Sequence, residues 1–338
     1  MHLFAPPDAY AVETMGPEGV LFPGTGTYTG ENREQGALLT YVINRPAKTE
    51  EAKPAEKVEA KEKKGKTAEP KPAPEPIKKD DKSKVKYDSV SLEVFDASGE
   101  KIRTLKRKAP EDNGINRMTW GLDEKGPQQP SREKPRRNIE RGGLTVQPGT
   151  YKLRITFGGQ KDSTMISVKH DPRFKGNEAD VKARYDLLKQ VNQLTELTAQ
   201  ATERIRESLE IVNDYEKRLK EAKRDDLKPA TEKTKVIKDS LNNLMDYIVG
   251  KEDKRQGITR QADPTPVNYI RTASSYIGRA NDAVSATDQR VLKQAEDKVA
   301  EVLARVNNFF LQHWVGYRAE MEKVNINPFK DYEPLKKN

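Results

Sequence analysis

The sequence predicts a multidomain α+β protein in which an antiparallel β-sandwich is followed by an antiparallel four-helix bundle with long helices. Between residues 37 and 168, short segments alternate apolar and polar side chains and are separated by Gly- and Pro-containing turns, which is typical of half-buried strands. After residue 177, apolar side chains recur every three or four positions, as they do in amphipathic helices. A chain of 338 residues is long enough for two such domains.

The strand predictions centre on a hairpin. Residues 91–96 and 101–105 alternate in polarity around Gly99, which supplies the positive φ that a tight turn requires. We expect the earlier strand at 37–43 to share one sheet with this hairpin. Further strands are predicted at residues 114–120, 152–157 and 163–168.

A low-complexity segment of Lys, Glu, Ala and Pro at residues 47–84 separates the strand at 37–43 from the hairpin. It has too few large apolar side chains to offset the entropy of ordering, so we predict a disordered or extended loop inserted in the sandwich domain. A linker between two domains is the alternative interpretation. The expected organisation is an extended N-terminal segment at 1–36, the sandwich at 37–170, the bundle at 171–325 and a C-terminal tail at 326–338.

Four helices are predicted in the second half. The first begins at Asn177, which forms a capping pair with Asp180, and runs for about 45 residues. The second starts at Pro229 and ends at Gly250. The third follows residues 263–266, and the fourth is capped by Ser285 or Thr287 and extends to Met321.

Composition limits the possible functions. The chain contains no cysteine, which excludes disulfides, cysteine metal sites and thiol catalysis. Its formal charge is +9, but acids are interleaved with the bases, and the densest basic cluster, at 132–141, lies in a predicted surface loop. A solvated surface of mixed charge is therefore the preferred interpretation over a nucleic-acid partner. A basic nucleic-acid binder, whose binding falls steeply with salt, is the alternative interpretation of this charge. No apolar run reaches the length of about 20 residues that a transmembrane helix needs. Residues 1–7 do not resemble a signal peptide, which indicates a cytoplasmic protein or the downstream part of a longer one.

No catalytic, cofactor or metal site is predicted. The three histidines are scattered, and His313, between Phe310 and Trp314, is interpreted as a packing or surface residue. The glycines at 24–30 lack the Lys-Ser/Thr ending of a phosphate loop. Trp120, Tyr151 and Phe157 are expected in the core, although aromatic side chains could also stack on a carbohydrate.

Interaction surfaces are the remaining candidates. The aromatic side chains near the end of the fourth helix form the candidate interaction site: Phe309, Phe310, Trp314 and Tyr317. The edge strands of the sandwich are a second candidate, because an edge can accept a strand from a partner.

A series of short motifs occurs in a distinctive order along the chain. These motifs are Leu3 to Pro6 and Tyr10, Tyr28 to Asn32, Gly36, Ala37 and Tyr41, Val94 to Asp96, Gly99, Ile102 and Arg103, Gly114 to Arg117 and Trp120, Pro148 to Tyr151, Asp171 to Arg173, Asp263 to Thr265, and Asn307. On these motifs the sequence resembles the C-terminal region of bacterial BNR-repeat, sortilin-like β-propeller proteins, which are often labelled glycosyl-hydrolase-like. The hairpin, the Trp120 strand and the Pro148-Gly149 turn are also similar to the immunoglobulin-like domain of the flagellar hook-cap type.

The resemblance implies an immunoglobulin-like sandwich with a helical tail, in a periplasmic, cell-surface or secreted protein. The expected function is a non-catalytic scaffold or protein-interaction module of an exported or cell-envelope protein, whose partner is another protein or a missing propeller domain. A carbohydrate is a further possible partner. The alternative is an accessory tail of a glycoside hydrolase or peptidase whose active site lies in an absent propeller.

Overall fold

The computed structural model describes residues 1–11, 35–45, 87–135, 139–173, 176–222, 224–251, 264–279 and 282–324. About 49% of the described residues are helical and 25% are in strands, so the protein is of mixed α and β structure. It divides into two compact units. The strand unit comprises Met1–Gly121 with Pro148–Lys169, and the helical unit comprises Leu122–Gln147 with His170–Asn338.

The strand unit contains two sheets. One has the order β1-β3-β6 and the other the order β2-β10-β9-β4-β5. The pairs that join β3 to its neighbours, and β4, β5, β9 and β10 to one another, are antiparallel. The strands are β1 (His2–Leu3), β2 (Ala9–Ala11), β3 (Ala37–Ile43), β4 (Ser89–Phe95), β5 (Lys101–Lys108), β6 (Gly114–Trp120), β9 (Gly149–Phe157) and β10 (Gln160–His170).

The buried residues of the strand unit come from both sheets. Alternate residues of β3 and β4 are buried, as the polarity pattern predicts. Trp120, from the three-stranded sheet, is fully buried, and its ring lies 5.7 Å from that of Tyr151 in the five-stranded sheet. Phe157 is also buried, so the expectation that these three aromatic residues belong to the core is confirmed.

One pairing prediction is wrong. Strand β3 does not share a sheet with the β4–β5 hairpin, because β3 pairs with β1 and β6 while β4 pairs with β5 and β9. The polarity of β3 allows it to bury one side in either sheet, so the local pattern does not select its partner. The predicted insertion at 47–84, the tail at 326–338 and the glycines at 24–30 lie outside the described residues.

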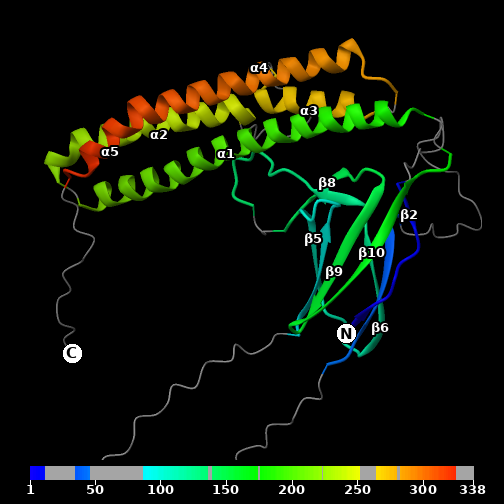
Figure 1. The fold of residues 1–338 in the computed structure, drawn as a ribbon. Helices are drawn as coiled ribbons and strands as arrows, with labels where there is room; N and C mark the ends of the chain where they lie inside the picture. The colour runs from blue at the N-terminus through cyan, green and yellow to red at the C-terminus, as the bar shows by residue number, and fades with distance from the viewer. Residues whose placement is uncertain are drawn as a thin grey trace, which may run out of the picture. The chain divides into compact units, whose positions relative to one another are not determined.

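The helical unit is built from long helices in three rows. Figure 1 shows α2 and α3 in line with one another, and α1 and α4 each run in the opposite direction to this row. α1 and α4 also contact one another and run in the same direction. The predicted four-helix bundle is therefore not confirmed, since two of its helices share a row. The helices are α1 (Glu178–Ala222), α2 (Lys228–Val249), α3 (Pro266–Ile277), α4 (Ala286–Asn308) and α5 (Val315–Met321), with short helical segments η1 (Asp225–Leu227) and η2 (Phe309–Trp314).

The helix ends agree with the cap predictions. The Asn177 side chain accepts a hydrogen bond from the backbone of Ala179 at the start of α1, which has the predicted 45 residues. At α4, Ser285 is the cap, and it forms a reciprocal capping box with Asp288. Thr265 caps α3, directly before Pro266 at the first helical position.

The segment Leu122–Gln147 belongs to the helical unit, whereas the sequence analysis placed it within the sandwich range. It contains the short antiparallel pair β7 (Asp123–Lys125) and β8 (Gly142–Thr145). Glu124 accepts hydrogen bonds from Tyr185 and Lys189 of α1. Arg132, expected in a free surface loop, pairs with Asp246 of α2 at 2.6 Å and donates to the Gly250 carbonyl.

Candidate protein-interaction site

The four predicted interaction residues lie together on η2 and the first turn of α5, but they are not equally accessible. Phe309 and Tyr317 are buried, whereas Phe310 and Trp314 are half-buried. The rings form a continuous series, with centroid separations of 5.3 Å from Phe309 to Phe310, 5.8 Å from Phe310 to Trp314 and 5.7 Å from Trp314 to Tyr317. Edge-to-face and tilted packing of this kind holds aromatic rings in fixed orientations.

A local change in helical winding positions these rings. Residues Phe309–Trp314 form a π-helical stretch between α4 and α5, a rare conformation that is frequent at functional sites. The buried side of the helix is held in place beyond this stretch, because the Tyr317 hydroxyl lies 3.2 Å from the Thr234 hydroxyl of α2. Phe309, Tyr317 and Met321 share one apolar core with residues of α1 and α2.

The outward side of the same stretch is apolar. Leu311 is 75% exposed and Val315 is 57% exposed, and they lie four residues apart, about one turn. Each directly follows a half-buried aromatic residue. We call Phe310, Leu311, Trp314 and Val315 the C-terminal apolar patch.

The sequence pattern predicted only half of this patch, Phe310 and Trp314. Phe309 and Tyr317 belong to the core. Leu311 and Val315 were not predicted, because the prediction was based on the aromatic residues. A signal was present, since residues 309–311 and 314–315 are apolar on more than one side of the helix. A helix that packs against a core needs only one apolar stripe, so apolar residues on a second side indicate a further contact surface.

The sheet edges differ in their capacity to accept a strand. In the described part of the chain, β6 ends the three-stranded sheet, and its Ile115 is 72% exposed. Strand β5 ends the five-stranded sheet, but it carries the exposed residues Lys106, Arg107 and Lys108. Charged side chains of this kind oppose edge-to-edge pairing, so β6 is the more receptive edge.

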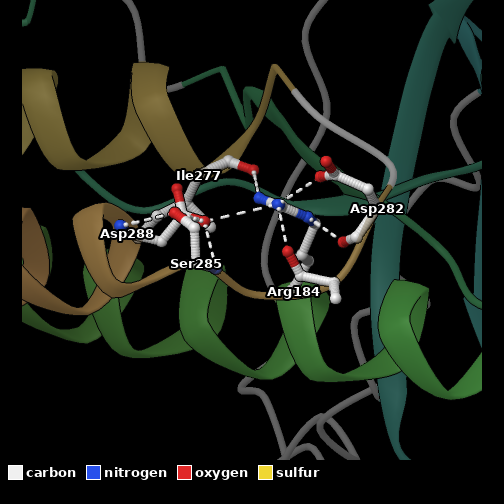
Figure 2. A network of polar contacts seen from close by, with 6 residues as sticks. Arg184, Ile277, Asp282, Ser285 and Asp288 are labelled. Atoms are coloured by element: carbon white, nitrogen blue, oxygen red, sulfur yellow. Dashed lines mark hydrogen bonds and ion pairs between the residues drawn. The ribbon is translucent and has the colours of Figure 1, made fainter.

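A partly buried polar network of the helical unit surrounds Arg184 of α1 (Figure 2). This side chain is 6% exposed and donates to the carbonyls of Ile277, Asp282 and Ala283 at 3.1, 2.6 and 2.9 Å. It also pairs with Asp282 at 2.6 Å and with Asp288 at 3.3 Å. The guanidinium therefore ties the connection between α3 and α4 to the start of α1.

Asp288 completes this network from the α4 cap. Burial opposes its ionisation, but hydrogen bonds from the backbone and hydroxyl of Ser285 and the charge of Arg184 lower the pKa of the carboxyl below its usual value. The polar groups of this network bond to one another, and these bonds hold the chain segments in place. We therefore interpret it as an architectural element. No feature of the sequence pattern predicts this network.

A small hollow in the helical unit is a weaker candidate for a functional site. A hollow of about 180 Å³ between α1 and α4 includes Leu197 and Leu303, and it is smaller than most ligand pockets. Among the described residues, no three His, Asp or Glu side chains gather closely enough to hold a metal ion. Of the helices in the same ranges, none combines the length and apolar character needed to cross a bilayer.

Comparisons with known proteins identify no relative. No protein-family model matches this chain. Searches among curated proteins and among solved structures likewise find no match. The surfaces described above therefore carry the evidence for function.

Proposed function

We propose that this chain is a non-catalytic scaffold that binds a protein partner through the C-terminal apolar patch. The observation that carries the proposal is the exposure of Leu311 and Val315 beside two half-buried aromatic residues. Burying side chains of this size stabilises a complex by about 1.5–3 kcal/mol each when they become fully enclosed. Aromatic anchors at the centre of such a patch are typical of interaction hot spots.

Preorganisation supports the same proposal. The rings of Phe310 and Trp314 pack on neighbours that belong to the core, so little rotational freedom is left to lose on binding. The π-helical winding presents Leu311 and Val315 on a helix whose opposite side is fixed by Tyr317 and Met321. A partner helix with apolar residues one turn apart would match this surface.

We also propose that the strand unit is an immunoglobulin-like sandwich of an exported or cell-envelope protein related to the sortilin-like propeller proteins. The strand order supports the fold assignment. The sheets β1-β3-β6 and β5-β4-β9-β10 follow the A-B-E and C′-C-F-G arrangement of immunoglobulin-like domains, with β2 added beside β10. The family and location rest on the motif resemblance alone.

The test is partner recovery from the native source with paired variants. Leu311→Glu combined with Val315→Glu places two charges in the patch, and the expected result is loss of a protein that co-purifies stoichiometrically with the unaltered chain. Val236→Glu is the matched control, because Val236 is 62% exposed on α2 and lies outside the patch.

Binding of the purified partner to each variant then gives the affinity. A loss of about tenfold or more in the patch variant alone supports the proposal. Equal binding by all three proteins, with unchanged helical circular dichroism, would show that the patch is not the interface.

A further inference from the structure

One side of the five-stranded sheet carries a local excess of positive charge. Leu92, Val94, Leu153 and Ile155 are fully buried, so the residues that alternate with them point away from the core. Glu93 is the one carboxylate among the outward positions of β4, β5, β9 and β10, whereas the whole chain has 53 acids to 62 bases. We call this side the cationic sheet face, and its bases are Lys101, Lys106, Lys108, Lys152, Arg154, Lys161 and Lys169.

The strand register arranges these residues in rows. Lys106 lies opposite Ser91, Ser91 opposite Thr156, and Thr156 opposite Lys161. The two lysines therefore lie at the ends of a row, with the two hydroxyls between them. The row spans three strand spacings, about 14 Å. Lys152 lies opposite Phe95, two rows away on the same face, and the Glu93–Arg154 row lies between.

Several of the positive charges are available to a ligand. Lys101 and Arg154 are occupied by Glu93, at 3.3 and 2.7 Å. Within the described ranges, Lys106, Lys152 and Lys161 have no carboxylate at ion-pair distance, and all three are exposed.

The chemistry of this face distinguishes between kinds of polyanion. Non-specific binding of single-stranded nucleic acid uses open aromatic rings on which bases stack. Among the outward positions of β4, β5, β9 and β10, Phe95 is the aromatic residue, and the Arg154 guanidinium covers it at 4.6 Å from the ring centroid. Tyr10 of the adjoining β2 is 43% exposed. The hydroxyls of Ser91 and Thr156 lie between the lysines, where they suit a chain rich in hydroxyl and carboxylate groups.

We propose that the cationic sheet face binds an acidic polysaccharide, with the carboxylates of a uronate chain paired to Lys106, Lys152 and Lys161. The sugar hydroxyls exchange hydrogen bonds with Ser91 and Thr156. Because these contacts are solvent-exposed, the affinity is modest and falls as salt rises.

The experiment measures binding of oligogalacturonate to the full chain by calorimetry, with neutral dextran as a negative control. The test variant combines Lys106→Glu, Lys152→Glu and Lys161→Glu. The control variant makes the same change in net charge at exposed positions of the helical unit, with Lys217→Glu, Lys235→Glu and Arg290→Glu. We expect affinity to fall on the order of tenfold from about 50 to about 200 mM salt. The test variant should lose roughly tenfold or more at low salt, and the control should lose much less.

Three outcomes would overturn the proposal. The first is absence of oligogalacturonate binding by the unaltered chain at low salt. The second is an equal loss in both variants, which would assign the effect to net charge. The third is tighter binding of oligothymidylate than of oligogalacturonate, which would indicate a nucleic-acid surface. Thermal melts of both variants establish that each is folded.

Discussion

At the scale of single residues, Arg184 shows how a buried charge is accommodated. Removing a guanidinium from water is unfavourable unless its hydrogen-bond donors are satisfied and its charge is balanced. Here the planar group reaches three carbonyls and two carboxylates, which come from the end of α3, the connection that follows it and the first turn of α4. The fixed fork of arginine suits this arrangement in a way that the ammonium of lysine does not.

Replacing Arg184 with methionine should destabilise the helical unit by about 3 kcal/mol or more, because Asp288 would keep a buried charge without its partner. The measurement is urea unfolding followed by helical circular dichroism. Arg290→Met, at an exposed position of α4, is the control and should change stability by less than about 0.5 kcal/mol. Similar midpoints for the two variants would contradict the assigned role of the network.

At the scale of elements, an ion-pair cluster joins α1 to α2. Glu216 of α1 binds Lys220 of its own helix and Lys238 of α2, each at 2.6 Å. Hydrogen bonds from Lys220 and Lys238 lower the pKa of the Glu216 carboxyl to about 2. The carboxyl therefore favours the folded state wherever it is ionised.

This cluster predicts a specific pH dependence. The folded-state pKa lies below the usual value of 4.5, so the stabilisation is present above about pH 4.5 and is lost as the pH falls towards about 2. Because the side chain is 22% exposed, screening reduces the contribution to about 1 kcal/mol. Glu216→Gln should remove this amount at neutral pH and flatten the stability profile between pH 4.5 and 2. Glu210→Gln, at an exposed position of α1, should retain the profile of the unaltered chain.

At the scale of the whole molecule, the two compact units have separate cores, and each contains one of the two tryptophans. Trp120 is fully buried in the strand unit, and Trp314 is half-buried in the helical unit. Single Trp→Phe variants therefore give fluorescence that reports on one unit at a time.

We expect the units to unfold independently. Adding Arg184→Met to the Trp120→Phe chain should lower the midpoint reported by Trp314. Adding it to the Trp314→Phe chain should leave the midpoint reported by Trp120 unchanged, since the altered contacts all lie in the helical unit. Urea unfolding followed by tryptophan fluorescence tests both arms. Equal shifts in the two would show that the protein unfolds as one cooperative unit.

Local pattern predicted many of the elements closely. Strand β3 spans the predicted residues 37–43, and α1 has the predicted length, because side-chain periodicity and capping residues act over a few neighbouring positions. Pairing was less predictable. The partners of β3 lie on β1 and β6, and no local feature of β3 distinguishes them from the hairpin.

The candidate site was likewise predicted only in part from the sequence. The sequence located the aromatic cluster at residues 309–317, but it could not assign Phe309 to the core and Leu311 to the surface. That assignment depends on the π-helical winding and on the packing of α5 against α2. The Arg184 network left no signal, because one arginine in a polar helix has the pattern of an ordinary surface residue.

The sequence by itself determined the strand-rich first half, the helix lengths and most caps, which are set by interactions between near neighbours. Only the tertiary structure decided that β3 and the hairpin occupy different sheets, that α2 and α3 share one row, and that segment 122–147 belongs with the helices. It also decided which lysines gather on one sheet face and which apolar side chains stay exposed. These features depend on contacts between residues far apart in the chain, and the local sequence pattern does not identify which distant residues will pair.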